Sequence, residues 1–462
     1  MTTQEAPQRA KWSGKWAFIL SAAASAVGLG NLWRFPYLAA KYGGGTFLLT
    51  YFVLVFTFGL SLLLLEIAFG RKTRLSVFSA FRSYGKKYAP IGFLAVVVPF
   101  IITPYYCIIG GWVTKYLTAY VTNSAASIAD VGGESGAFFT GFITSPVASQ
   151  VFMLVFMAIT VGVVALGVKN GIEKANFIMM PALIVMAIAI AIFTVLQPGA
   201  AEGVAYYLCP DFSKFSPELV INALGQMFYS LSLAMAIMIT YGSYVDKKDN
   251  LPTSAARIVS FDFIVSFLAG IMIVPGAFIA LGSADAVAAK AGPSLMFVTL
   301  PQVFSDMGFA GQIVGFVFFL LVLFAALTSA ISLTEACVSN IQDATSWSRK
   351  KSLAVFTAFL VVCGLVVNAG YSGLSFIQPL GEGSTLLDFF DFISNSVLMP
   401  IVAICTCIFV GFIIKPQAII DEIRQSSTFG AAGAWAFMIK FVAPVLVAII
   451  LITNILPYLG IG

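Results

Sequence analysis

The 462-residue sequence contains no histidine, and only 10% of its residues are charged. Without histidine the chain lacks the commonest general base of enzymes and a frequent ligand of metal ions, and it has no HExxH-like cluster or evident nucleophile–base pair. Its six cysteines show neither a metal-binding pattern nor a disulfide framework. We therefore expect a protein that is not an enzyme and that carries no organic cofactor.

Charge of either sign is too sparse to form one continuous charged face. The net charge is +5, and the basic residues are spread over several short connections between apolar runs. A nucleic-acid-binding protein concentrates basic residues on one surface, so we expect no nucleic-acid partner.

The sequence is rich in apolar residues, which make up 60% of the chain, and 14% of its residues are aromatic. One soluble core cannot bury so much apolar surface, so the lipid bilayer is the expected surrounding. A membrane helix needs about 20 apolar residues, and the long unbroken runs exclude the short alternating strands of a barrel. The predicted fold is all-α, with eleven transmembrane helices. They begin near Trp16, Gly45, Ala89, Val151, Phe177, Leu219, Ile258, Gly311, Leu353, Leu387 and Trp435.

Basic residues predict the orientation, because they favour the cytoplasmic side of a membrane. Arg9, Lys11 and Lys15 lie in the N-terminal tail, and further basic residues follow the second, sixth and eighth runs, whereas the third connection carries Asp130 and Glu134. We therefore predict a cytoplasmic N-terminus. The tail, residues 1–15, has no small-residue cleavage site, so the first run is expected to remain a membrane helix.

Two of the apolar runs are interrupted near mid-membrane. The first contains two glycines and an asparagine within residues 25–31, and the sixth contains small and hydroxylated residues at 230–236. Close helix packing through small residues is an alternative explanation for the first. The sixth run comes five spans after the first, which is an odd number, so the two helices cross in opposite directions, as expected for an inverted repeat of five plus five helices. We predict that helices 1 and 6 are broken and that their free carbonyls and amides bind a cation and a carboxylate.

Other polar residues inside the predicted membrane spans support a site at the same depth. Ala325, Thr328, Ser329, Ser332 and Glu335 recur at helical spacing and form one polar stripe. Hydroxyls in such a stripe either ligate sodium or bond back to carbonyls one turn earlier, and the sequence leaves both readings open. Asp262 is a site candidate, because a carboxylate at the bilayer centre costs about 2.5 to 3.5 kcal/mol unless it has a partner. Glu66 also lies within an apolar run, and a structural role is one explanation for it.

Several long motifs resemble the neurotransmitter:sodium symporter family. They are AVGLGNLWRFPYLAAKYGGGTF at residues 26–47, Tyr105, Tyr106 and Trp112, GIEKANFIMMP at 171–181, SLSLAMAIMITYGSY at 230–244, and LTSAISLTE at 327–335. The resemblance implies sodium-coupled import of a neutral, hydrophobic amino acid by alternating access. Eleven helices resemble the bacterial leucine, tryptophan and tyrosine symporters, which implies a bacterial inner (plasma) membrane. Residues 16–415 would be the ten-helix transport core, and 416–462 a loop with the peripheral eleventh helix.

The resemblance also implies two sodium sites built from oxygen ligands alone. The first site would use Ala26, Asn31, Ser230 and Asp262, together with the carboxylate of the substrate. The second site would use the carbonyls of Ala24, Val27 and Ala325 with the hydroxyls of Thr328 and Ser329.

A neutral amino acid is the substrate that the family pattern implies, since Gly28 stands where amine transporters carry aspartate. The substrate-binding residues would be Ala24, Ser25, Gly28, Leu29, Gly30, Ile102, Tyr106, Tyr229, Ser232, Met235, Ser329 and Leu333. Ala234 and Ala236 replace the family's usual glycines, which favours small substrates such as alanine or glycine, whereas flexible Met235 favours aromatic ones. The sequence does not decide between them.

Asp262 also bears on chloride, because the family commonly has asparagine at this position. The chain retains Ser266, Tyr51, Gln226 and Ser230, which resemble the residues that hold chloride in animal members. A carboxylate beside sodium supplies the negative charge that chloride would provide, so we predict chloride-independent transport.

Gates are expected above and below this site. On the outer side Arg34 would pair with Asp388 or Asp391. On the inner side Arg9 and Trp12 would lock against Asp343, Ser243 and Tyr244. Gly171 and Pro181 would let the fifth helix unwind and release sodium. A sodium channel is the alternative outside transport, since oxygen sites also suit an ion filter.

Overall fold

The computed structural model describes residues 10–122, 136–283, 286 and 294–456, and this part of the chain contains no β-strand, only an isolated bridge between Gly44 and Pro210. The first half consists of α1 (Lys15–Ala26), η1 (Gly30–Arg34), α2 (Phe35–Lys41), α3 (Gly45–Leu54), η2 (Val55–Gly59), α4 (Leu60–Thr73), α5 (Val77–Ser83), η3 (Lys86–Tyr88), α6 (Ala89–Val121), α8 (Gly136–Ile143), α9 (Ala148–Ala165), η4 (Val168–Glu173), α10 (Lys174–Val195) and α11 (Ala200–Leu208).

The second half continues the helical pattern to the end of the described chain. It consists of η5 (Phe212–Lys214), α12 (Pro217–Ser230), α13 (Ile237–Gly242), α14 (Leu251–Leu281), η6 (Leu295–Thr299), α16 (Leu300–Asp306), α17 (Phe309–Thr345), α18 (Arg349–Ala369), α19 (Leu386–Asp391), η7 (Phe392–Leu398), α20 (Met399–Ile408), η8 (Phe409–Ile413), α21 (Pro416–Arg424), α22 (Ala432–Phe437), η9 (Met438–Val442) and α23 (Ala443–Ile455). The all-α prediction is confirmed.

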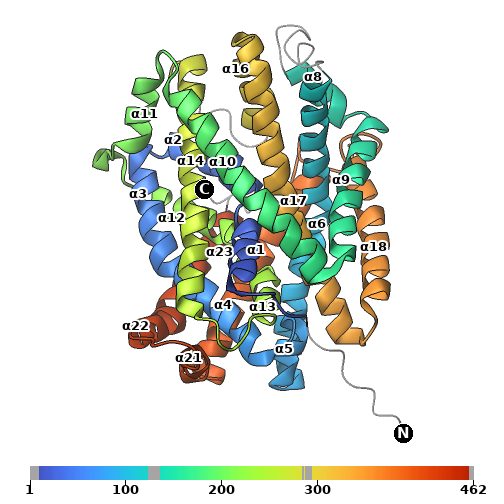
Figure 1. The fold of residues 1–462 in the computed structure, drawn as a ribbon, viewed down its shortest axis with the longest axis vertical. Helices are drawn as coiled ribbons and strands as arrows, with labels where there is room; N and C mark the ends of the chain where they lie inside the picture. The colour runs from blue at the N-terminus through green and yellow to red at the C-terminus, as the bar shows by residue number, and fades with distance from the viewer. Residues whose placement is uncertain (1–9, 123–135, 284–285, 287–293, 457–462) are drawn as a thin grey trace.

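The long helices run between two ends of the molecule, with α8, α11 and α16 at the top of Figure 1 and α5, α21 and α22 at the bottom. In the described residues, nine helices are long and apolar enough to span a membrane, and α1 with η1–α2 forms a bent pair that makes a tenth. The short helices α12 and α13 would add an eleventh crossing if they act as one span. The exact number of eleven therefore stays a prediction.

Both predicted breaks are present. Helix α1 ends at Ala26, Val27 is extended, and the chain resumes after Gly28 at an angle of 51° to α1. The second break runs from Leu231 to Ala236, between α12 and α13. Small residues permit both breaks, because they cover little of the backbone that must find partners outside a helix.

The packing of the broken helices follows the predicted inverted repeat. The first half of each broken helix packs along the span that follows the other break: α1 lies against α14, and α12 lies against α3. The second halves do the same, with α2 against α14 and α13 against α4. Exchanging the two five-helix halves therefore reproduces these four contacts, and α6 and α17, the third helix of each half, pack against each other.

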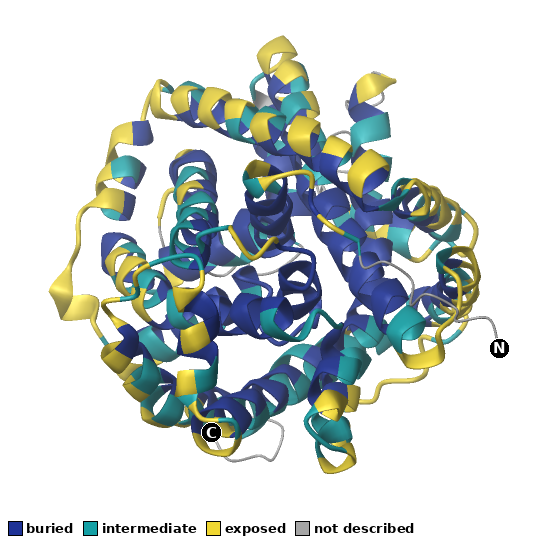
Figure 2. Cartoon of the chain, turned by 60° about the horizontal axis from the view of Figure 1, so that its bottom comes forward, coloured by how far each residue is buried: buried dark blue, intermediate teal, exposed yellow. Residues whose placement is uncertain are grey.

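The apolar surface of the molecule faces outward along the helices. On α10 the exposed side chains include Ile178 and Val185, at 69% and 65% exposure, and Leu196, just after the helix ends, is 76% exposed. Buried residues fill the centre of the bundle, and exposed residues lie on its rim (Figure 2). An exposed apolar surface of this extent is what a lipid-facing helix bundle requires.

Candidate functional site

The two breaks meet at one cavity in the centre of the bundle. Its empty space is about 350 Å³, and every predicted substrate residue except Ala24 contributes to its wall. The lining residues are Ser25, Ala26, Gly28, Leu29, Gly30, Asn31, Ile102, Tyr106, Tyr229, Ser230, Ser232, Met235, Ile237, Ser329 and Leu333. Ala24 is fully buried and does not line the cavity.

The backbone of the first break lies directly against two polar side chains. A Cβ atom at Gly28 would lie 2.8 Å from the Ser329 hydroxyl and 3.1 Å from the Tyr106 hydroxyl. The amide of Leu29 donates a hydrogen bond to the Tyr106 oxygen over 3.3 Å. Gly30 is equally close to the ring of Tyr229, at 2.8 Å from a Cβ. Glycine is therefore needed here for close approach, and any side chain at residue 28 would occupy the cavity wall.

Backbone carbonyls and amides that lack a helical partner at the breaks are hydrogen-bonded to side chains. The carbonyl of Ser25 accepts hydrogen bonds from the hydroxyls of Ser232 and Ser329, both at 3.1 Å. In the second break, the amide of Ala234 donates to the carboxylate of Glu66 over 2.7 Å. These bonds join α1, α17 and α4 to the two breaks, so the non-helical backbone is held in a defined shape.

The second break has unusual backbone geometry. Ser232, Ala234 and Ala236 have φ angles of 54°, 58° and 62°, so every second residue is in the left-handed region. A residue with a Cβ pays about 1 to 2 kcal/mol to adopt this conformation. The bond to Glu66 therefore supports a segment that its own residue types do not favour.

Asp262 lies beside the cavity and is fully buried. Its carboxylate accepts hydrogen bonds from Asn31 Nδ2 and the Tyr51 hydroxyl, both at 2.8 Å, and from the hydroxyl of Ser230. Asn31 also donates to Ser230 and Ser266, each at 2.8 Å. No lysine or arginine in the described chain is within ion-pair distance of Asp262. The carboxylate of Asp262 is therefore surrounded by polar side chains, and within the described residues no cationic side chain lies beside it.

The residues of the predicted second sodium site are buried between α1 and α17. Thr328 donates back to the carbonyl of Ala325 over 3.0 Å, which is the bond one turn earlier that the sequence left open. Ser329 instead reaches across to α1. Ala24, Val27 and Ala325 are all fully buried, but none of them lines the cavity.

A wider hollow, with about 1300 Å³ of empty space, lies on the other side of Tyr229. Arg34, Asp388 and Asp391 all line it. The guanidinium of Arg34 is 6.0 Å from the ring centre of Tyr229, and within the described residues it forms no ion pair.

The two acidic residues at this hollow differ in their present partners. Asp388 caps the start of α19, where it accepts from the amide and hydroxyl of Thr385, both at 2.8 Å. Asp391 accepts from Asn395 over 2.6 Å. The structure thus brings Arg34 and both carboxylates to one hollow without joining them.

The opposite end of the bundle is closed around Trp12, which is only 7% exposed. Its indole donates to the carbonyl of Tyr241 over 3.1 Å, and its amide donates to the carbonyl of Tyr244 over 3.3 Å. Tyr244 in turn donates to Glu335 over 2.8 Å, and the carbonyl of Ser243 accepts from Arg74 over 3.3 Å.

The predicted inner gate contains two further residues, Asp343 and Arg9. Asp343 accepts from the amide and hydroxyl of Ser76 at 2.7 and 2.5 Å. Arg9 lies outside the described residues.

Sequence reasoning missed two residues around this site. Ile237 lines the cavity, and Glu173 accepts from the amide and hydroxyl of Ser13 just before α1. Glu66, for which the sequence allows a structural role, holds the second break. A charge within an apolar run was the available signal for Glu66, because buried charges need partners. The absence of a side chain at Gly171 has a packing role, because a Cβ atom there would lie 1.9 Å from the carbonyl of Val163.

Replacing Glu66 by alanine should destabilise the second break. The Ala234 amide would lose its acceptor in a buried place, which costs about 1 to 3 kcal/mol. We expect the Glu66→Ala protein to melt at a lower temperature in detergent. Glu66→Gln keeps an acceptor oxygen and serves as the control, so equal melting temperatures for the two variants would contradict this role.

Comparisons with known proteins agree on one family. The model of the sodium:neurotransmitter symporter family matches residues 9–127 and 141–461. An uncharacterised sodium-dependent transporter of Bacillus subtilis is 34% identical, over 96% of this chain and 97% of its own length. A sodium- and chloride-dependent taurine transporter of Canis lupus familiaris is 26% identical, over 95% and 77% of the two chains.

A solved structure supports the same assignment. The crystal structure of MhsT in complex with L-phenylalanine superimposes with a TM-score of 0.86 at 35% sequence identity, covering 96% of this chain and 100% of the other. The fold, the broken helices and the long sequence matches agree, and the chain belongs to the sodium:neurotransmitter symporter family of membrane transporters.

Proposed function

We propose that the protein is a sodium-coupled symporter that imports a neutral, hydrophobic amino acid without requiring chloride. The observation that carries the proposal is the buried carboxylate of Asp262, which lies beside a cavity between two broken helices and has no cationic side-chain partner in the described chain. Burial penalises an isolated charge strongly, and a bound monovalent cation removes that penalty.

The first sodium ion would bind between Asp262, Ser230, Asn31 and the carbonyl of Ala26. Asn31 Nδ2 now approaches three oxygen atoms, although it has only two hydrogens to share among them. A flip of the amide, which exchanges its nitrogen and oxygen, would present the oxygen to the same point, and it would give up the hydrogen bond that Oδ1 now accepts from the amide of Gly28. The oxygen-only ligand set fits a hard cation such as sodium.

A second sodium ion would bind between α1 and α17. Its ligands would be the carbonyls of Ala24, Val27 and Ala325 with the hydroxyls of Thr328 and Ser329. Both hydroxyls now donate to carbonyls, and a cation requires them to turn their lone pairs toward it. The fifth helix, with Gly171 and Pro181, would unwind to release this ion.

The substrate would bind with its carboxylate at the first break, against the amides of Leu29 and Gly30, the hydroxyl of Tyr106 and the first sodium ion. Its ammonium would be held by backbone carbonyls around Ser25 and Ser232. The side chain would extend toward Ile102, Met235, Ile237 and Leu333, an apolar wall that disfavours charged side chains. MhsT was solved with L-phenylalanine, which supports a hydrophobic amino acid over alanine or glycine.

Sodium and substrate would be coupled because they share one contact. When the carboxylate of the substrate completes the shell of the first sodium ion, each ligand raises the affinity for the other by the same factor. Arg34 would close on Asp391 over the occupied cavity, since Asp388 is already engaged as a helix cap. Arg9 and Trp12 with Asp343, Ser243 and Tyr244 would form the inner gate, on the cytoplasmic side of a bacterial plasma membrane.

Uptake by purified protein in liposomes tests the proposed activity. With sodium outside and potassium inside, we expect labelled phenylalanine or leucine to accumulate above its external concentration, and no accumulation without the gradient. Competition by all twenty amino acids would define the preferred side chain. Sodium current without accumulation would contradict symport and favour the channel, and inhibition by alanine or glycine alone would favour a small substrate.

Replacing chloride by gluconate in the same assay tests the role of Asp262. We expect an unchanged uptake rate, because the carboxylate already supplies a negative charge next to the first sodium ion. Loss of uptake in gluconate, with recovery when chloride is restored, would refute chloride independence while leaving symport intact.

A further inference from the structure

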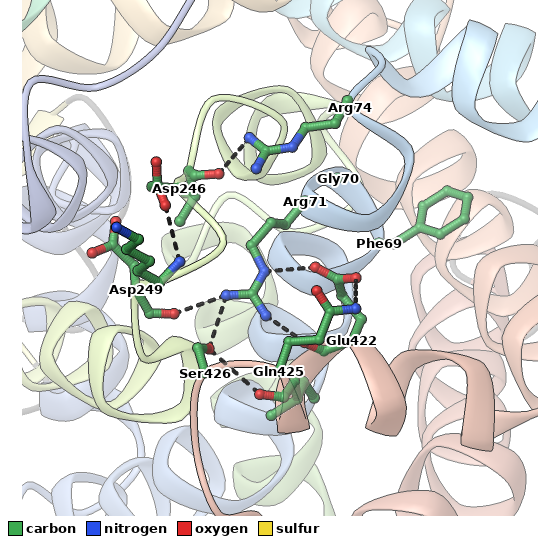
Figure 3. Close-up of polar contacts among 12 residues, drawn as sticks. Phe69, Gly70, Arg71, Arg74, Asp246, Asp249, Glu422, Gln425 and Ser426 are labelled. Carbon is green, nitrogen blue, oxygen red and sulfur yellow. Dashed lines mark hydrogen bonds and ion pairs between the residues drawn. The ribbon is translucent and has the colours of Figure 1, made fainter.

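A charged cluster lies at the lower end of the bundle, away from the central cavity. It is centred on Arg71, at the end of α4, and extends to Glu422 on α21 and to the chain after α13 (Figure 3). The side chains of Arg71 and Glu422 are 0% and 3% exposed. A fully buried ion pair is a costly feature, and it specifies one geometry more than it adds stability.

The guanidinium of Arg71 donates hydrogen bonds to two separate segments, one around Glu422 and one at Asp249. Its Nε donates to Glu422 Oε1 over 2.8 Å, and one terminal nitrogen donates to the carbonyl of Glu422 over 2.5 Å. The other terminal nitrogen donates to the carbonyl of Asp249 over 2.8 Å and to the hydroxyl of Ser426 over 3.0 Å. Lysine cannot make this planar set of bonds, so arginine is required.

Helices α4 and α13 pack backbone against backbone near this cluster. A Cβ at Gly70 would lie 2.0 Å from the carbonyl of Ile239, and one at Gly242 would lie 2.4 Å from the carbonyl of Ile67. Backbone contact this close leaves no room for the two helices to slide independently. Arg74 also donates to the carbonyls of Ser243 and Val245, just after α13 ends.

The other side of the ion pair belongs to a different part of the molecule. Helix α21 lies on the connection between α20 and α23, which pack against each other. The Arg71–Glu422 pair therefore joins the end of α4, which packs against α13, to the last helices of the chain. Trp12 binds the same end of α13, through the carbonyls of Tyr241 and Tyr244.

We propose that Arg71 and Glu422 form a clasp that positions α13 so that its carbonyls can hold Trp12, which makes α21 a part of the inner gate. The proposal rests on transport by alternating access. In alternating access, opening of the site toward the cytoplasm requires α4 and α13 to move together relative to α21, and the Arg71–Glu422 clasp opposes that movement. The last segment of the chain thus acts on the gate instead of being only peripheral.

Hydrogen exchange of the full-length protein in lipid nanodiscs tests the clasp. In potassium buffer, we expect Glu422→Gln and Arg71→Lys to raise exchange in α1, residues 15–26, by at least about fivefold, which is the lower end of usual coupling between sites. Helix α1 contains none of the clasp residues, so faster exchange there reports opening of the gate. Asp421→Asn removes a neighbouring, exposed charge from the same helix and should leave α1 unchanged.

Two results would overturn the proposal. One is faster exchange confined to α21 and residues 246–250, and the other is a lower melting temperature with unchanged exchange in α1, since both describe a purely structural ion pair. If the two variants do not fold, Ser426→Ala removes a single bond and should still raise α1 exchange by a smaller factor. Exchange is measured without sodium or substrate, so failure of the wild-type protein to accumulate an amino acid is a separate result.

Discussion

The burial of one carboxylate without a cationic side-chain partner constrains the centre of this molecule. Asp262 is surrounded by Asn31, Tyr51 and Ser230, which solvate the carboxylate but do not neutralise it. These three neighbours come from η1, α3 and α12, and Asp262 itself lies on α14, so the charge helps to determine where these four elements meet. A site that must be neutralised from outside the chain is well suited to couple ion binding to helix position.

The broken helices answer a second requirement, which is that every buried backbone group must find a partner. The carbonyl of Ser25 is satisfied by the hydroxyls of Ser232, in the second break, and Ser329, on α17, and the amide of Ala234 by the carboxylate of Glu66, on α4. Ser329 and Glu66 thus belong to helices that cross the bundle elsewhere. The shape of the breaks therefore depends on the position of α4 and α17, and movement of either helix changes what the breaks can bind.

Much of this arrangement is predictable from the sequence, and the residues show why. The breaks are visible because glycine, asparagine and serine stand where helix-forming apolar residues are expected. Most cavity residues follow from their place in long motifs. The partner of Glu66 and the pairing of Arg71 with Glu422, 351 positions apart, are not visible, because no local pattern encodes such contacts. The capping role of Asp388 had a local signal in Thr385, three residues earlier, and the sequence interpretation did not use it.

Equilibrium binding of radioactive sodium to the purified protein tests the central claim most directly. The account predicts that the wild-type protein binds sodium, that phenylalanine or another transported amino acid increases its sodium affinity, and that Asp262→Asn lowers this affinity by about tenfold or more, since one tenfold step corresponds to about 1.4 kcal/mol. Equal sodium affinity in the wild-type and Asp262→Asn proteins, with no response to amino acids, would contradict it.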